Sequence, residues 1–127
     1  MREALVFTVP MPPNVTNRAS GRSHWRVRHN ERTAYWELLD GMRVCRHIPQ
    51  PPPEPIPQAV LASHMVLGGA MDDDNALARH KHLVDWLVRR GYLASDRRTC
   101  VRWAGLPEQR VSRKVKPTIT LTITPAP

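Results

Sequence analysis

The stretch that decides the fold is Gln58–Arg90, QAVLASHMVLGGAMDDDNALARHKHLVDWLVRR. Its first ten residues are mostly Val, Leu, Met and Ala and predict a strand, which Gly68 and Gly69 end. Helical spacing of apolar residues then predicts one helix from about Asn75 to Arg90, with Gly91 as its C-cap. The apolar face of that helix is expected to comprise Leu77, Val84, Leu87 and Val88, with Leu83 at its border. A strand followed by a helix indicates a mixed α/β or α+β domain.

The rest of the chain adds a second helix and more strands to this unit. Apolar residues at steps of three and four predict a helix from Asn30 to Ile48, whose stripe contains Tyr35, Leu38, Leu39, Met42 and Cys45 or Arg46. Further strands are predicted at 2–9, 99–103 and 118–124, and a polar turn region at 105–114. Prolines make residues 49–57 an exposed, extended connector. We therefore expect a single α/β (α+β) domain over 1–127, a small mixed sheet with two main helices.

The charge of the chain favours a polyanionic partner. The 127 residues include 19 Lys+Arg against 11 Asp+Glu, a net charge of +8, and the pI is about 10.7. Such a balance is most often found in nucleic-acid-binding proteins, although a merely basic protein is the alternative. No apolar run reaches the ~18 residues of a membrane helix, and the N-terminus lacks a secretory signal. We expect a cytoplasmic protein whose Cys45 and Cys100 are reduced, buried thiols.

Histidines do not suggest a zinc site. His80 and His82 are two residues apart, which places them on different sides of a helix, and no Cys or His pair completes a tetrahedral set. We expect these histidines to be solvated or to face DNA.

The segment from Asp72 to Asp96 contains five of the eleven acidic residues in the chain. Three are consecutive, and their mutual repulsion favours either protonation or a bound cation. In an extended segment Asp72 and Asp74 project to one face, so they form the candidate ligand pair for Mg²⁺ or Mn²⁺. Lys81 lies about two helical turns beyond Asp74 and suits a phosphate oxygen. A solvated helix cap is the alternative interpretation of the acidic run.

Basic residues are concentrated in two other segments. Arg18, Arg22, Arg26 and Arg28 surround Trp25, and Arg110, Arg113, Lys114 and Lys116 follow the third strand. Guanidinium groups suit phosphates, and an exposed indole suits a base. Carboxylates for a divalent metal within a cationic protein suggest phosphodiester hydrolysis.

Three segments resemble the RusA family of Holliday junction resolvases. They are VPMPPNVTN at Val9–Asn17, DDDN at Asp72–Asn75 and DWLVRRGYLASD at Asp85–Asp96. The resemblance implies a RusA-like α/β domain, a homodimer, dependence on Mg²⁺ and paired nicks in four-way DNA junctions. Carried over by position, the essential acids would be Asp72, Asp74 and Asp96, and the functional lysine Lys81.

One departure from the family pattern concerns that lysine. The family places it about one turn after the second aspartate, where this chain has Ala78. A short insertion near the start of the helix would explain why the lysine is found at position 81. Arg79 is the alternative to Lys81 in this role, and it is also a DNA-binding candidate.

The sequence therefore predicts a Mg²⁺-dependent, structure-selective endodeoxyribonuclease that resolves Holliday junctions in recombination and repair. It would act in the cytoplasm of a bacterial or phage-infected cell, without a membrane or a small-molecule cofactor. The alternatives are a non-catalytic or degenerate basic DNA-binding protein, a nuclease for flaps or other DNA structures, and a basic scaffold that binds a protein through its proline run.

Overall fold

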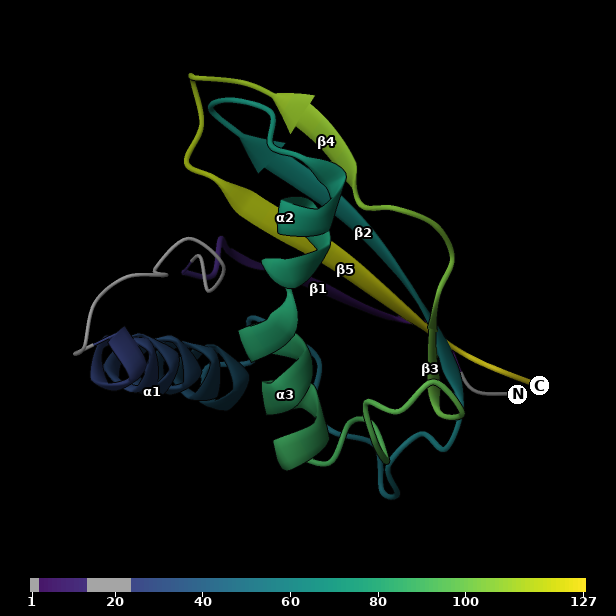
Figure 1. Cartoon of the computed structure of the whole chain (residues 1–127). Coiled ribbons are helices and arrows are strands. Elements are labelled where there is room, and N and C mark those ends of the chain that lie inside the picture. The colour runs from purple at the N-terminus through teal and green to yellow at the C-terminus, as the bar shows by residue number, and fades with distance from the viewer. Residues whose placement is uncertain (1–2, 14–23) are drawn as a thin grey trace.

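The computed structural model describes residues 3–13 and 24–127, which form one mixed sheet and three helices. The strands are β1 (Leu5–Pro10), β2 (Ala59–Leu67), β3 (Val101–Trp103), β4 (Glu108–Val111) and β5 (Thr118–Pro125). The helices are α1 (His24–Val44), α2 (Asp73–Ala78) and α3 (Lys81–Arg89). This architecture confirms the predicted small α+β fold with a mixed sheet (Figure 1).

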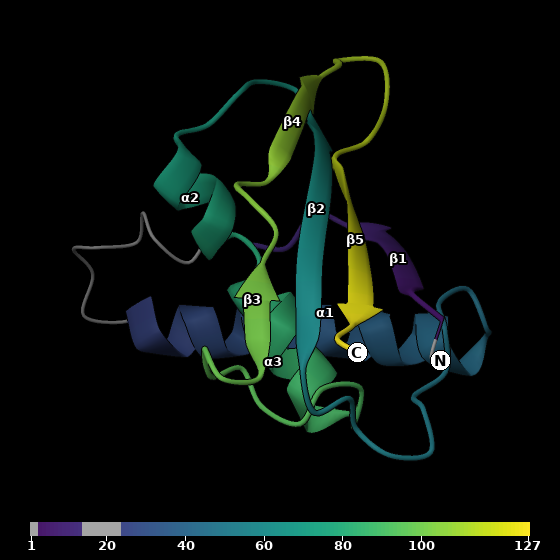
Figure 2. The same cartoon turned by 90° about the vertical axis from the view of Figure 1, so that its right-hand side faces the viewer.

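The sheet is organised around β2 and β5. β5 lies between β1 and β2 and pairs antiparallel with both. The far edge of β2 pairs in parallel with two short strands, first β3 along Ala59–Leu61 and then β4 along His64–Leu67. Both short strands therefore run toward the end of the sheet at which β2 finishes (Figure 2).

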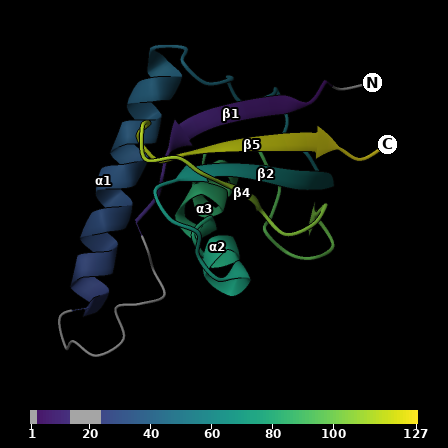
Figure 3. The same cartoon turned by 90° about the horizontal axis from the view of Figure 1, so that it is seen from above.

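The helices lie on one face of this sheet. Figure 2 shows α1 and α3 behind the strands, and Figure 3 shows α1 running across the strand direction. Alternate residues of β2 are buried, with Leu61 and Met65 fully inaccessible, while Ala62 and His64 between them are exposed. Such alternation is expected for a sheet covered on one face. It places the core, which includes Phe7, Leu39, Trp86, Ile119 and Leu121, between sheet and helices.

Helix boundaries differ from the prediction in two places. α1 begins at His24 rather than Asn30, within a segment that was predicted to be a loop, and it ends at Val44. The predicted helix over 75–90 is two helices, because the chain turns at Arg79 and His80. In α3 the buried side chains include Leu83 and Leu87, whereas Leu77 of α2 is exposed, so Leu83 belongs to the centre of the apolar face.

A polar contact fixes α1 against α3. Asp40 accepts two hydrogen bonds from Arg90, both at 2.8 Å, and a third from Trp86 Nε1 at 2.9 Å. Trp36 of α1 donates its own indole N–H to the carbonyl oxygen of His82 at 2.9 Å. These four side chains thereby satisfy polar groups at the contact between the two helices.

The proline-rich connector is anchored rather than fully exposed. Ile56 is buried and exchanges two backbone hydrogen bonds with the segment after α3, through Tyr92 and Ala94. Tyr92 also donates its hydroxyl to the carbonyl oxygen of Pro49 at 2.5 Å. The connector joins α1 to β2 as predicted, and one apolar residue within it completes the core.

Two predictions about cysteine and one about the membrane can be compared with the structure. Both cysteines are free thiols, but Cys45 is exposed and Cys100 only partly buried, so the expected burial was wrong. Cys45 lies just beyond the end of α1, where the chain leaves the core.

Among residues 3–13 and 24–127, no helix is both long and apolar enough to cross a bilayer.

Candidate active site

The acidic run lies where the chain passes from β2 into α2. Asp72 is the N-cap of α2 and has extended backbone angles, but its side chain makes no capping hydrogen bond. Asp73 and Asp74 occupy the first turn of the helix, and all three side chains are exposed. The expected extended segment is therefore wrong beyond Asp72. In a helix successive side chains are rotated by about 100°, so Asp72 and Asp74 do not project to one face as they would in a strand.

A glutamine that was not predicted as a site residue fixes the start of this acidic run. Gln109 of β4 accepts a hydrogen bond from the backbone N–H of Met71 and donates one to its carbonyl oxygen, both at 2.9 Å. Met71 immediately precedes Asp72, so the amide holds the N-cap of α2 against β4. Its signal in the sequence is weak, because β4 is a short polar strand within a predicted turn region.

The break between α2 and α3 is stabilised by a buried histidine. His80 is 1% exposed and its Nε2 lies 2.5 Å from the hydroxyl of Ser63 on β2. Its Nδ1 lies 2.8 Å from the carbonyl oxygen of Ala76, which can only accept, so Nδ1 carries the proton. Burial lowers the pKa of His80. The expectation of a solvated or DNA-facing histidine was wrong here, because Ser63 offers a partner on the covered face of the sheet.

The second histidine is also buried, again contrary to expectation. His82 is 6% exposed, and both ring nitrogens are buried with no hydrogen-bond partner among the residues that the structure describes. Burial is the main cause that lowers its pKa. His82 therefore belongs to the contact between α3 and α1 and takes no part in the candidate site.

A pocket at the α2–α3 junction brings together residues from three separate segments. It has a volume of about 180 Å³ and is lined by Leu77, His80, Lys81, Val84, Asp85, Asp96 and Trp103. Lys81 and Asp96 were both predicted as site residues, and the structure places them on one pocket. Asp85, which lies within the third resembling segment, is also present, with an oxygen 3.5 Å from Lys81 Nζ.

The other predicted acids do not line this pocket. Asp72 and Asp74 lie on α2, ahead of the pocket residue Leu77, and neither is among the lining residues. The turn at His80 also means that Lys81 does not follow Asp74 on one continuous helix, as was expected. In the described part of the chain, no three His, Cys, Asp or Glu side chains lie close enough to hold a metal ion together.

The pocket nevertheless has donors that fit a magnesium ion. Mg²⁺ prefers oxygen ligands, keeps several waters, and commonly takes only one or two carboxylates from a protein together with substrate phosphates. Asp85 and Asp96 supply two carboxylates on the pocket wall. Asp96 is exposed and has no hydrogen bond or ion pair within residues 3–13 and 24–127, so it is available as a ligand.

The predicted DNA-binding residues lie in different parts of the chain. Arg18 and Arg22 lie outside the described residues, as does most of the first basic segment. Arg26 is exposed on α1, and Arg28 is on the same helix. Arg79 is partly buried, and its Nε donates to the carbonyl oxygen of Pro12 at 2.6 Å, which ties α2 to the segment after β1.

The last group of basic residues lies at the same end of the sheet as the acidic run. Arg110 belongs to β4, and Arg113, Lys114 and Lys116 are exposed in the connection from β4 to β5. Because β4 runs parallel to β2, this connection leaves the sheet where β2 leads toward Asp72 (Figures 1 and 2).

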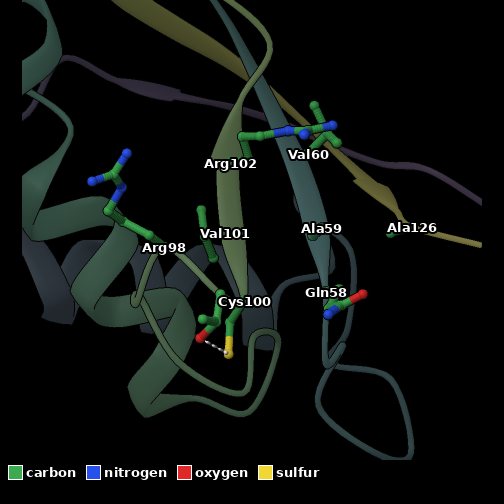
Figure 4. Close-up of a pocket in the computed structure, with 9 residues that line it drawn as sticks. Gln58, Ala59, Val60, Arg98, Cys100, Val101, Arg102 and Ala126 are labelled. Atoms are coloured by element: carbon green, nitrogen blue, oxygen red, sulfur yellow. Dashed lines mark hydrogen bonds between the residues drawn. The ribbon is translucent and has the colours of Figure 1, made fainter.

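A second hollow is found at the opposite end of β2. It has a volume of about 220 Å³, and its lining includes Gln58, Arg98, Cys100 and Arg102 (Figure 4). Figure 4 shows the side chains of Arg98 and Arg102 pointing in different directions, so they do not converge on one anion. Cys100 Sγ lies 3.8 Å from the Thr99 hydroxyl. The pocket at the α2–α3 junction therefore remains the better candidate site.

Comparison with models of protein families and with curated proteins found no match for this chain.

Proposed function

We propose that the protein is a Mg²⁺-dependent endonuclease that cleaves phosphodiester bonds in branched DNA, with the four-way junction as its substrate. The observation that carries the proposal is the pocket at the α2–α3 junction, which joins Lys81, Asp85 and Asp96 on one surface. Asp85 and Asp96 both belong to the segment Asp85–Asp96, which resembles a resolvase, and Lys81 is the lysine that this resemblance implies. Together they have the chemistry that phosphodiester hydrolysis needs. A net charge of +8 supports a DNA substrate.

The residues of the pocket would have two roles, to bind the metal ion and to bind the phosphate. Asp96 and Asp85 would hold the ion, whereas Asp72 and Asp74 do not line the pocket. The chemistry that such an ion supplies when bound is polarisation of the phosphoryl group and a lower pKa for the attacking water. Lys81, held beside Asp85, would neutralise the charge that develops on the phosphate oxygens.

Symmetry and cellular location follow from the same proposal. A four-way junction has nearly two-fold symmetry, so a homodimer would present two identical pockets to two equivalent strands. The reaction would take place in the cytoplasm of a bacterial or phage-infected cell, where recombination and repair produce such junctions.

The test is cleavage of an end-labelled four-way junction with Mg²⁺ and with EDTA. The wild-type protein is expected to cleave only with Mg²⁺. Asp96→Asn is expected to lose at least about 100-fold in rate while it still binds the junction, because the substitution removes a ligand and a negative charge. Glu54→Gln, in the proline-rich connector, is the control that removes one charge away from the pocket. Cleavage that is unchanged in Asp96→Asn, or absent from the wild type, would contradict the proposal.

A non-catalytic DNA-binding protein is the second candidate. The observation that favours it is that the described residues gather no set of three metal-binding side chains. In that case the protein binds the junction equally well with Mg²⁺ and with EDTA and leaves it intact.

A further inference from the structure

The pocket at the α2–α3 junction has an apolar half as well as a charged half. Leu77, Val84 and Trp103 line it beside Lys81, Asp85 and Asp96. Metal binding and phosphate binding explain the charged residues only. An indole and two aliphatic side chains beside these charges form a surface that suits a planar or apolar group.

Trp103 is held in place before any ligand arrives. It is the last residue of β3, and its ring meets the ring of His80 edge-to-face, with centroids 5.2 Å apart and planes at 73°. His80 is in turn fixed by its bonds to Ser63 and to the backbone of Ala76. The indole is partly buried, so one part of it remains open. A rigid, partly exposed aromatic ring is well suited to stacking, because little conformational entropy is lost when a partner binds.

The size of the pocket limits what can enter. Its volume of about 180 Å³ is smaller than the ~300–1,000 Å³ of sites for drug-sized molecules. It has room for one ring system together with a phosphate at the rim, and a stacked base pair is larger than this. Lys81, with a side chain that is 62% exposed, supplies the positive charge at that rim.

We propose that this pocket receives a single unpaired nucleotide, whose base or deoxyribose stacks on Trp103 while its phosphate lies against Lys81. Leu77 and Val84 contact the other side of the ring. Every base has a π-face, so such stacking tolerates any sequence and recognises the unpaired state itself. An intact duplex does not offer an unstacked nucleotide, whereas a branch point does so at low cost.

This inference rests on the proposed function and deepens it, because it names the feature of branched DNA that the site recognises. It also makes Trp103 a specificity residue that acts at the binding step. Binding can be measured without divalent metal, so the inference can be tested separately from cleavage.

The experiment measures binding of a four-way junction, a single-stranded oligonucleotide and a duplex in EDTA, by anisotropy. Trp103→Ala is expected to weaken binding of the junction and the single strand about tenfold and to leave duplex binding nearly unchanged. Trp103→Phe, which keeps a ring in contact with His80, is expected to retain most of the affinity. Leu106→Ala is the matched control, because Leu106 is 59% exposed, follows β3 and lies outside this pocket.

A substitution at Leu77 tests the pocket independently of how the Trp103 variants fold. Leu77 is exposed, so Leu77→Asn leaves the core intact while it makes the apolar wall polar. It is expected to weaken junction binding about threefold. A 2-aminopurine base at the branch point is expected to be less fluorescent in the wild-type complex than in the saturated Trp103→Ala complex, because the indole quenches a stacked base.

The outcomes separate the inference from the proposed function. Cleavage by the wild type together with equal binding by Trp103→Ala and Leu106→Ala would overturn the inference and leave the nuclease. Weaker binding and loss of quenching in Trp103→Ala, without any cleavage by the wild type, would support the inference and remove the nuclease. An equal loss of affinity for duplex and junction would also overturn it, because the residue would then not distinguish unpaired DNA.

Discussion

His80 and His82 show how neighbouring residues of one type can have different structural roles. Both are buried, yet His80 has a partner on each ring nitrogen and His82 has none within the described residues. A buried polar group without a hydrogen bond costs about 1–3 kcal/mol. His82 therefore weakens the contact between α3 and α1, while His80 stabilises the turn before α3.

Replacement of His82 by leucine is expected to stabilise the protein by about 1 kcal/mol. Leucine is similar in size and removes from the helix interface two ring nitrogens that have no hydrogen-bond partner within residues 3–13 and 24–127. Urea unfolding at pH 7.5 measures the change. His47→Leu, at an exposed histidine, is the control and is expected to change the unfolding free energy little. A clear loss of stability in His82→Leu would show that the imidazole has a partner in solution.

The same substitution is expected to change the dependence of stability on pH. Burial lowers the pKa of His82 below its ordinary value of 6.5, so the unfolded chain binds more protons than the folded one in that range. The stability of the wild type is thus complete above pH 6.5 and falls as the pH drops toward the lowered pKa. In His82→Leu this fall is expected to be smaller, with the remainder due to His80, and unfolding at pH 5.5 and 7.5 compares the two.

At the scale of secondary-structure elements, one carboxylate fixes α1 against α3. Asp40 accepts three hydrogen bonds, two of them from Arg90 and one from Trp86. The hydrogen bonds from Arg90 are the main cause of a lowered pKa for Asp40. Hydrogen bonds to charged groups contribute more than neutral ones, and this carboxylate is only partly exposed.

Substitution Asp40→Ala is expected to destabilise the protein by about 1–3 kcal/mol, because it leaves the Trp86 N–H and the Arg90 guanidinium without their acceptor. Chemical unfolding near neutral pH measures the effect, and Glu37→Ala on the exposed side of α1 serves as the control. Since the pKa of Asp40 is lowered on folding, its contribution is present above pH ~3.8 and is lost as the pH falls further. Equal stability of the two variants would show that the three bonds do not hold the helices together.

Elements with strong apolar periodicity could be predicted from the sequence, and the others could not. The alternation in β2 and β5 reflects one covered face of the sheet, and both strands were found within a residue or two of their predicted ends. β4 was missed, because none of its four residues is buried and pairing with β2 alone defines it. The break between α2 and α3 depends on Ser63, which lies seventeen residues before His80 and has no local signal.

At the scale of the whole molecule, the candidate site is assembled from segments that the sequence keeps apart. Asp96 and Lys81 were predicted as site residues, and the structure brings both to one pocket with Asp85. Trp103 and Gln109 were not predicted, because their roles follow from the way in which β3 and β4 pair with β2. The distance between Asp72 and the pocket could not be inferred either, since it depends on the turn at His80.

The distribution of charge predicts how DNA binding depends on salt. Lys114 and Lys116 lie in the connection from β4 to β5, at the same end of the sheet as the acidic run. If each contacts a phosphate, the double substitution Lys114→Ala and Lys116→Ala is expected to reduce the slope of log K against log salt by about 2. Titrations of a junction at several salt concentrations measure the slope.

A control with the same change in charge distinguishes local contacts from overall attraction. Arg46→Ala with Arg89→Ala removes two exposed cations, one beyond the end of α1 and one in α3. This pair is expected to change the slope by less than one. Equal slopes for the two double variants would show that the connection between β4 and β5 makes no specific phosphate contacts.

The position of β5 has a consequence for biosynthesis. β5 follows every other strand in the chain, yet it lies between β1 and β2 and supplies their only shared neighbour within the described sheet. A nascent chain that has emerged from the ribosome only as far as residue 117 holds both flanking strands but not the strand that connects them. The sheet therefore cannot be completed before translation has passed Pro125. Until then β1 and β2 lack their shared neighbour, and chaperones can bind their exposed apolar side chains.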